Sequence, residues 1–187
     1  SSGVALSDEE RMKFVGRVYR LRNTLALQFL ELAEQHPQDP IAVDALIQAL
    51  WQVNGTPWPL ELVGTDDASA RALTRLQRDH LDSEKLGALC QRLAFGFRQE
   101  YETLLRAVLE KSPHAAVQAQ ACLSLAQFLN NRLQRLDLLS EQPALATEFA
   151  DLFGAEYLAQ LQRQDRAEII SEVESLFERA TEQYGDV

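Results

Sequence analysis

The stretch EKSPHAAVQAQACLSLAQ, residues 110–127, can be interpreted as a reactive site or as the corner between two packed helices. Ser112 can cap a helix and Pro113 can occupy its first position, so the residues that follow are expected to be helical. Residues 34–43 repeat this order of a glutamate, a proline break and a new apolar helix, with no cysteine in the equivalent place. The comparison favours a helix-to-helix corner.

Apolar residues recur with a helical period through most of the chain, and no stretch shows the alternation or hairpin signals of a strand. Ser7 and Glu10 form a capping box that opens a helix expected to end at His36, and Asp39 with Pro40 starts the next one. The first helix has an apolar face that runs through Phe14, Val18, Leu21, Leu25, Phe29 and Leu32. The sequence predicts an all-α fold of about eight or nine helices, packed as antiparallel hairpins.

The later helices are expected to be separated near residues 80–82, at Gly96, at Ser112-Pro113, at Gln142-Pro143 and at Gly154. A second capping box, Asp165 with Glu168, starts the last helix. The apolar residues expected on these helices include Leu86, Leu89, Leu93, Tyr101, Leu104, Leu105, Val108, Leu109, Val117, Leu125, Ile169, Val173, Leu176, Phe177 and Ala180.

Four segments of the chain resemble one another: residues 29–46, 105–122 and 177–187, with a weaker copy at 73–89. Most pair a large apolar residue and a glutamate with a Pro or Gly break, and their irregular spacing approaches that of tetratricopeptide and HEAT repeats. We therefore expect residues 1–187 to form a single helical domain built as a degenerate repeat.

The chain is strongly acidic, with 28 Asp and Glu against 18 Lys and Arg, a formal charge of −10 and an isoelectric point of about 4.8. Such a mean field repels phosphate backbones, so nucleic acid is not an expected partner. The helical segments are too polar to span a bilayer.

The residues that could perform chemistry are scattered. Cys90 and Cys122 each fall in an apolar helical pattern, which predicts two buried, unlinked thiols rather than a disulfide or a reactive site. His36, His80 and His114 stand far apart at predicted helix boundaries, where capping or surface roles are expected.

The densest polar cluster, residues 78–84, is interpreted as a capped helix junction. No Cys-x-x-Cys, phosphate loop or nucleophile elbow is present in the sequence. We therefore predict no catalytic, cofactor-binding or metal-binding residue in this chain.

Two features could contact a protein partner. Trp58 lies between Pro57 and Pro59 in the one long predicted loop, residues 54–67, where it either anchors an interface or folds back as a lid. The first helix is rich in positive charge, which indicates either a solvated face or self-association with an acidic surface; its basic residues are Arg11, Lys13, Arg17, Arg20 and Arg22.

The segments FLELAEQHPQDPIAVDAL (29–46), RDHLDSEKLGALCQRLA (78–94), LLRAVLEKSPHAAVQAQACLSLAQFL (104–129) and FERATEQYGDV (177–187) resemble the helical region before the thioredoxin-like, redoxin-type domain of bacterial thiol-disulfide oxidoreductases. The resemblance implies a bacterial, exported protein that continues into a redox domain after Val187. The catalytic Cys-x-x-Cys of that family has no match here, so the resemblance assigns no redox residue to this chain.

These observations favour a non-catalytic binding or scaffolding module. Its partner would be the protein's own thioredoxin-like domain, a substrate protein or a second copy. The alternatives are a helical enzyme whose site is assembled from distant residues, and a homo-oligomerisation domain.

Overall fold

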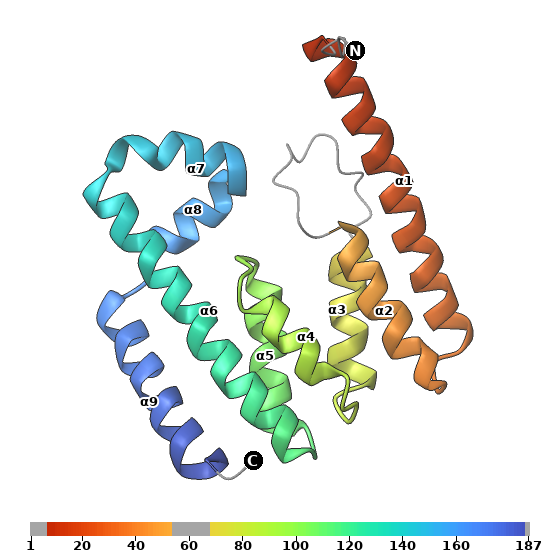
Figure 1. Ribbon diagram of the computed structural model, residues 1–187. Helices are drawn as coiled ribbons and strands as arrows, with labels where there is room; N and C mark the ends of the chain where they lie inside the picture. The colour runs from red at the N-terminus through yellow and green to blue at the C-terminus, as the bar shows by residue number, and fades with distance from the viewer. Residues whose placement is uncertain (1–6, 54–67, 186–187) are drawn as a thin grey trace, which may run out of the picture. The chain divides into compact units, whose positions relative to one another are not determined.

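The computed structural model describes residues 7–53 and 68–185, and all regular secondary structure in these ranges is helical (Figure 1). This confirms the all-α prediction. The described elements are nine α-helices and one 3-10 helix: α1 Asp8–Gln35, α2 Pro40–Val53, α3 Ala68–Asp79, α4 Leu86–Leu93, α5 Gln99–Lys111, α6 Ala115–Glu141, η2 Pro143–Leu145, α7 Ala146–Phe153, α8 Ala155–Gln162 and α9 Arg166–Tyr184. The chain divides into two compact units, Ser1–Ala72 and Leu73–Val187. The single-domain and repeat interpretations stay predictions.

The first unit contains a hairpin of α1 and α2, which pack against each other. The capping box is confirmed: the Ser7 hydroxyl accepts from the Glu10 backbone N–H, and the Glu10 carboxylate accepts from the Ser7 N–H at 2.9 Å. The carboxylate of Asp39 accepts from Ile41 N–H at 2.9 Å, so α2 begins at Pro40 as the sequence predicts. Both helices of the hairpin therefore start where their local sequence caps them.

The apolar face that the sequence assigns to α1 is not the face that the helix buries. Of the predicted face, Phe14, Val18, Leu21 and Leu25 are exposed, with Leu21 62% accessible, and Phe29 and Leu32 are half-buried. The buried residues are instead Gly16, Tyr19, Ala26, Leu30 and Ala33. With 3.6 residues per turn, the two stripes lie roughly 140° apart around the helix. The buried stripe consists mainly of small residues, which allow close helix packing but contribute little to hydropathy patterns.

Helix α2 is also too short to cover the whole of α1. Helix α1 has 28 residues and α2 has 14, and the backbone oxygen of Trp51, near the end of α2, accepts a hydrogen bond from Arg22 at 3.0 Å. The antiparallel α2 therefore reaches only the level of Arg22, and the first half of α1 extends past it (Figure 1).

The second unit is built around α6, which packs against α4, α5 and α9 (Figure 1). The apolar residues predicted on α4 and α5 are all buried, and α9 buries Ile169, Val173 and Leu176. Phe177, predicted on the same apolar face of α9, is instead 48% exposed. Helices α7 and α8 pair with each other across Gly154, whose φ of 93° favours glycine at that corner.

The stretch 110–127 is a helix-to-helix corner, with a start that differs from the prediction. Helix α6 begins at Ala115 with His114 as its N-cap residue, so Pro113 precedes the helix and Ser112 ends α5. The Ser112 hydroxyl accepts from the His114 backbone N–H at 3.4 Å within this corner. The helix therefore starts two residues later than it would with Ser112 as its cap.

Candidate interaction surface

A partly buried network of charges joins α5, α6 and α9, with Glu102 and Arg132 at its buried end. The two oxygens of Glu102 are shared: Oε1 accepts from Nε and one terminal nitrogen of Arg106 at 2.9 and 2.7 Å, and Oε2 accepts from Arg132 and, at 3.2 Å, from Gln99. Arg106 also forms a two-pronged pair with Glu172 of α9. Each guanidinium and each carboxylate in this network therefore forms a hydrogen bond with an oppositely charged side chain.

The charges in this network favour the ionised state of Glu102. Burial alone would raise the pKa of the Glu102 carboxyl, but the hydrogen bonds and charges of Arg132 and Arg106 outweigh it and lower the pKa. The pKa of Arg106 is raised, first of all by its hydrogen bonds to Glu172. A carboxylate held ionised with both oxygens occupied is poorly suited to proton transfer, so the network is structural.

The network was not predicted from the sequence, although the spacing of two of its members is visible there. Glu102 lies within the buried face of α5, and Arg106 follows it at the i,i+4 spacing that allows a helical ion pair. A carboxylate on an apolar face with a cation one turn away indicates a buried pair.

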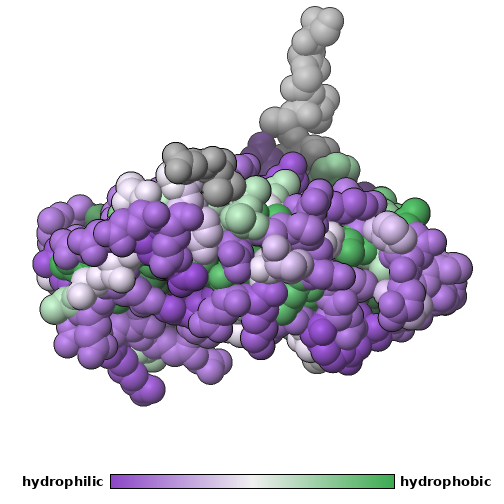
Figure 2. Space-filling view, turned by 90° about the horizontal axis from the view of Figure 1, so that it is seen from below, coloured by the Kyte–Doolittle hydropathy of each residue, from purple (hydrophilic) through white to green (hydrophobic). Residues whose placement is uncertain are grey.

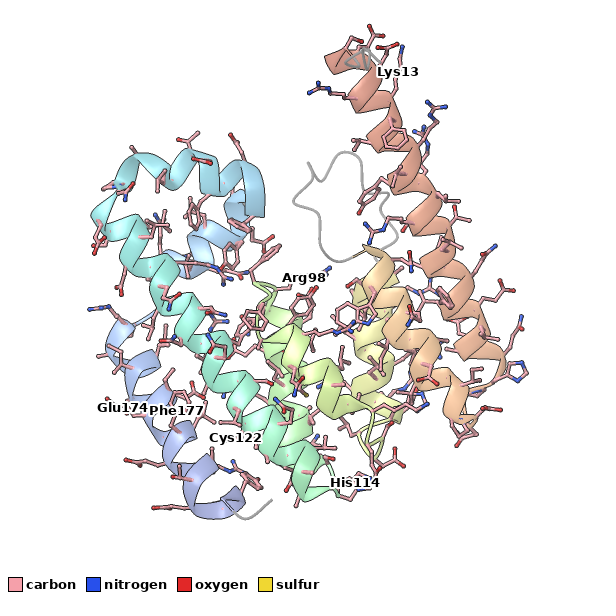
Figure 3. The ribbon with its side chains drawn as sticks, viewed as in Figure 1. Lys13, Arg98, His114, Cys122, Glu174 and Phe177 are labelled. Atoms are coloured by element: carbon pink, nitrogen blue, oxygen red, sulfur yellow. The ribbon has the colours of Figure 1, made fainter. Side chains whose placement is uncertain are left out.

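The two cysteines are buried and unlinked, as predicted. Burial raises the pKa of the Cys90 thiol to about 12, and it also raises the pKa of Cys122. The Cys122 thiol donates to the backbone oxygen of Leu176 at 3.2 Å, which joins α6 to α9 (Figure 3). Neither environment favours the nucleophilic thiolate.

All three histidines lie at helix boundaries, as the sequence predicts. His36 ends α1, and His80 directly follows α3. The Nε2 of His114 donates to the backbone oxygen of Asp82 at 2.7 Å, and its Nδ1 lies 3.5 Å from a carboxylate oxygen of Glu84. The structure therefore brings the polar cluster 78–84 beside the 110–114 corner.

The Arg78 side chain of that cluster pairs with its neighbour Asp79 and lowers the pKa of the Asp79 carboxyl. Among the described residues, no group of three or more His, Cys, Asp or Glu side chains could hold a metal ion.

An aromatic cluster connects the start of α5 with α7 and α8. The Phe97 ring lies 4.9 Å from Phe153 and 5.4 Å from Tyr157 between centroids, in edge-to-face arrangements, and Phe149 lies 5.3 Å from Phe153. Arg135 of α6 donates to the Tyr157 hydroxyl at 3.3 Å and to the backbone oxygen of Gly96 at 3.0 Å. The cluster stabilises the α7–α8 hairpin against α6 and was not evident in the sequence, because its members come from distant segments.

In the described part of the first unit, the exposed stripe of α1 offers an interaction surface. We call Phe14, Val18, Leu21 and Leu25 the α1 seam; their 4-3-4 spacing is that of coiled-coil contact positions. Basic side chains flank the seam, with Arg17 on one side and Arg11 and Arg22 on the other, while Lys13 and Arg20 lie farther round the helix on the Arg17 side. Lys13, marked in Figure 3, pairs with Glu9 one turn away, and this ion pair is fully exposed.

The surface visible in Figure 2 is mainly hydrophilic, with hydrophobic residues distributed between polar ones. Within the two described ranges, no helix combines the length and apolar character needed to cross a bilayer. Trp58 and the rest of the predicted 54–67 loop lie outside the described residues, so that predicted contact stays a prediction.

Comparison with known proteins gives no relative: no family model, curated protein or solved structure matches this chain.

Proposed function

We propose that this chain is a non-catalytic helical binding module that contacts another protein through the α1 seam. The observation that supports this proposal is the exposure of four large apolar side chains, at coiled-coil spacing, on a helix that already buries a different stripe. Single exposed apolar residues are ordinary on a soluble protein, but a contiguous row along three turns of one helix is typical of a contact surface.

The charge beside the seam favours a protein partner with an acidic surface. Residues 8–22 carry three acidic and five basic side chains, a net charge of +2 within a chain of −10. Helix-in-groove and coiled-coil partners are selected by such flanking charges, while the apolar row provides most of the affinity. The module would therefore bind an apolar helix or groove edged by Asp and Glu.

The thioredoxin-like domain expected after Val187 is a further part of this proposal, and it rests on the sequence resemblance alone. The fragment itself would then supply binding and no redox chemistry, in keeping with two thiols whose pKa values are raised by burial. Under this proposal the bound protein would be either the substrate of the redox domain or another subunit.

Photo-crosslinking from defined positions tests the proposal. A benzophenone amino acid at Leu21 should crosslink to one identifiable protein in cells that produce the whole protein, because Leu21 lies in the centre of the seam. The matched control is Ile41, which is 47% exposed on α2 and away from the seam. Specific adducts from Ile41 but none from Leu21 would place the contact elsewhere and overturn the proposal.

A further inference from the structure

We propose that the partner of the α1 seam is α9 of a second copy of this chain. This inference rests on the proposed binding function and adds the identity of the partner. The contact is between two separate molecules: α1 belongs to the first unit of one copy, and α9 belongs to the second unit of the other copy.

Helix α9 carries an exposed row with the same spacing as the α1 seam. We call Ile170, Glu174, Phe177 and Thr181 the α9 seam; all four are exposed, and they follow the same 4-3-4 order. The row lies beside the stripe of Ile169, Val173 and Leu176 that α9 buries in its packing with α6. A second helix could therefore lie along α9 without displacing its packing on α6.

The apolar members of the α9 seam lie near its middle and one end. Phe177 and Ile170 provide two large apolar contacts, and Figure 3 marks Phe177 beside Glu174 on this helix. The α1 seam supplies four apolar side chains for the same length of helix. Ile170 and Phe177 would therefore provide the apolar contacts, and Glu174, which lies between them in the row, would meet a basic side chain of α1.

The charges of the two helices are complementary. Residues 166–184 carry five glutamates and two arginines, a net charge of −3. The two arginines have contacts within their own unit, Arg166 with Asp137 and Arg179 with Gln183. Glu174 lies exposed within the seam, and Glu178 and Glu182 lie exposed on the side of the seam away from α6. Arg17, exposed beside the α1 seam, and Arg20, exposed farther round the same side of α1, provide the opposite charge.

A second α1 seam is a poorer occupant than α9, because pairing two α1 helices would place their basic edges together. An anionic lipid surface would also attract the basic edge of α1. The remainder of the chain outside residues 8–22 carries a net charge of −12, which opposes approach to such a surface. The acidic α9 seam satisfies both the spacing and the charge of α1.

Contact between two different faces is heterologous, so each copy has one donor face and one acceptor face. Two copies could close reciprocally, or successive copies could form an open chain. In either case, loss of one face would block self-association but would leave the other face intact. This property gives the inference a specific test.

The test measures molar mass by sedimentation equilibrium, over a range of concentrations, for the wild-type chain and two double variants. The α1 variant is Phe14→Gln with Leu21→Gln, and the α9 variant is Ile170→Gln with Phe177→Gln. Each variant alone should self-associate about tenfold or more weakly than the wild type, because each loses the apolar centre of one face. An equimolar mixture should form heterodimers and no larger species, because one intact α1 seam meets one intact α9 seam.

Control variants and charge reversal complete the design. Ile41→Gln on α2 and Leu123→Gln on α6 remove equally exposed apolar groups outside both seams and should leave self-association unchanged. Reversing Arg17 and Arg20 to Glu should weaken self-association, and adding Glu174→Arg and Glu178→Arg to the same chain should restore it. Circular dichroism of each variant identifies any that fail to fold, and the restored four-site variant provides a result that misfolding cannot imitate.

Three results would overturn the inference. The first is a wild-type chain that stays monomeric at every concentration; the second is self-association that survives loss of either seam. The third is a monomer that binds vesicles of anionic lipid through the α1 seam. If Leu21 nevertheless crosslinks to a different protein in cells, the proposed binding function stands and only the identity of the partner fails.

Discussion

The two longest helices, α1 with 28 residues and α6 with 27, are nearly equal in length but differ in how they are packed. Helix α6 packs against α4, α5 and α9 and buries apolar residues on several sides. Helix α1 packs against the much shorter α2 (Figure 1) and leaves Phe14, Val18, Leu21 and Leu25 exposed. Since a single helix is marginally stable without tertiary packing, α6 depends on its neighbours along most of its length. The first half of α1 has apolar surface to offer to a partner.

This difference in packing indicates that the apolar residues of α6 stabilise the fold, whereas the exposed apolar residues of α1 are candidates for contact with a partner. In α6, Phe128 and Arg132 stack with the guanidinium carbon 5.1 Å from the ring centroid, and Arg132 also pairs with Glu102. In α1, Phe14 is 57% exposed. Equivalent substitutions on the two helices should therefore have very different effects on folding and on binding.

The largest expected effect is on the core of the second unit. Phe128→Ala should reduce the free energy of unfolding by about 3–5 kcal/mol, because it removes a fully buried aromatic ring and leaves a cavity. Phe14→Ala, the matched change on α1, should alter it by no more than about 0.5 kcal/mol. Chemical denaturation at a protein concentration that keeps the chain monomeric measures both values, and a similar loss for the two variants would remove the contrast between the helices.

The buried Glu102–Arg132 pair of the charge network should give an effect of similar size. Glu102→Gln leaves Arg132 buried without its carboxylate and should cost about 3–5 kcal/mol. Glu100→Gln, two residues before Glu102 and on the exposed side of α5, is the control and should change stability little. Replacing Glu102 and Arg132 together with Leu and Met should recover much of the loss, because no unpaired charge then remains at that position.

The same network predicts a dependence on pH. The folded-state pKa of Glu102 lies below its unfolded value of about 4.3. Its contribution to stability is therefore fully present above that value and is lost as the pH falls through the folded-state pKa. The difference in unfolding free energy between wild type and Glu102→Gln should be constant near neutral pH and should shrink below about pH 4; a difference that grows on acidification would contradict the assignment.

The helix boundaries could be predicted from the sequence because their causes are local. The Ser7, Asp39 and Asp165 caps lie within three residues of the backbone groups that they satisfy. Gly154 likewise ends a helix through its own backbone conformation. The start of α6 was predicted two residues too early, because Ser112 and Pro113 are residue types that suit a cap and a first helical position, whereas His114 is the residue at the cap.

The face that each helix buries could be predicted only where neighbouring helices cover it along its whole length. The predicted faces of α4 and α5 are buried. On α1 the predicted apolar row is largely exposed, because the helix buries a different stripe that includes Gly16, Ala26 and Ala33, small residues that contribute little to a hydropathy pattern. The charge network and the aromatic cluster each require three segments of the chain to meet. The spacing of residues within one helix does not specify which other segments that helix will contact.

The thiols provide a smaller test of the packing of α6. Cys122→Ala should cost about 1 kcal/mol and leave self-association unchanged, because the side chain is small, buried and outside both seams. The native protein should react with a maleimide much more slowly than the denatured chain, since burial raises the pKa of both thiols. Rapid labelling of native Cys122 would show that the α6–α9 contact opens readily.

The smallest expected effect compares the caps of α9 and α1. The Asp165 carboxylate accepts from the Ala167 and Glu168 backbone N–H groups, so Asp165→Ala should reduce global stability by about 1 kcal/mol, because α9 is packed along α6. Ser7→Ala removes an equivalent cap, but the first turns of α1 extend past α2 and can open without unfolding the hairpin. Ser7→Ala should therefore change global stability by only about a few tenths of a kcal/mol, while amide exchange over residues 9–14 becomes faster. At concentrations where copies associate through the α1 seam, that exchange should slow again; the same rate at low and high concentration would mean that this part of α1 gains no partner.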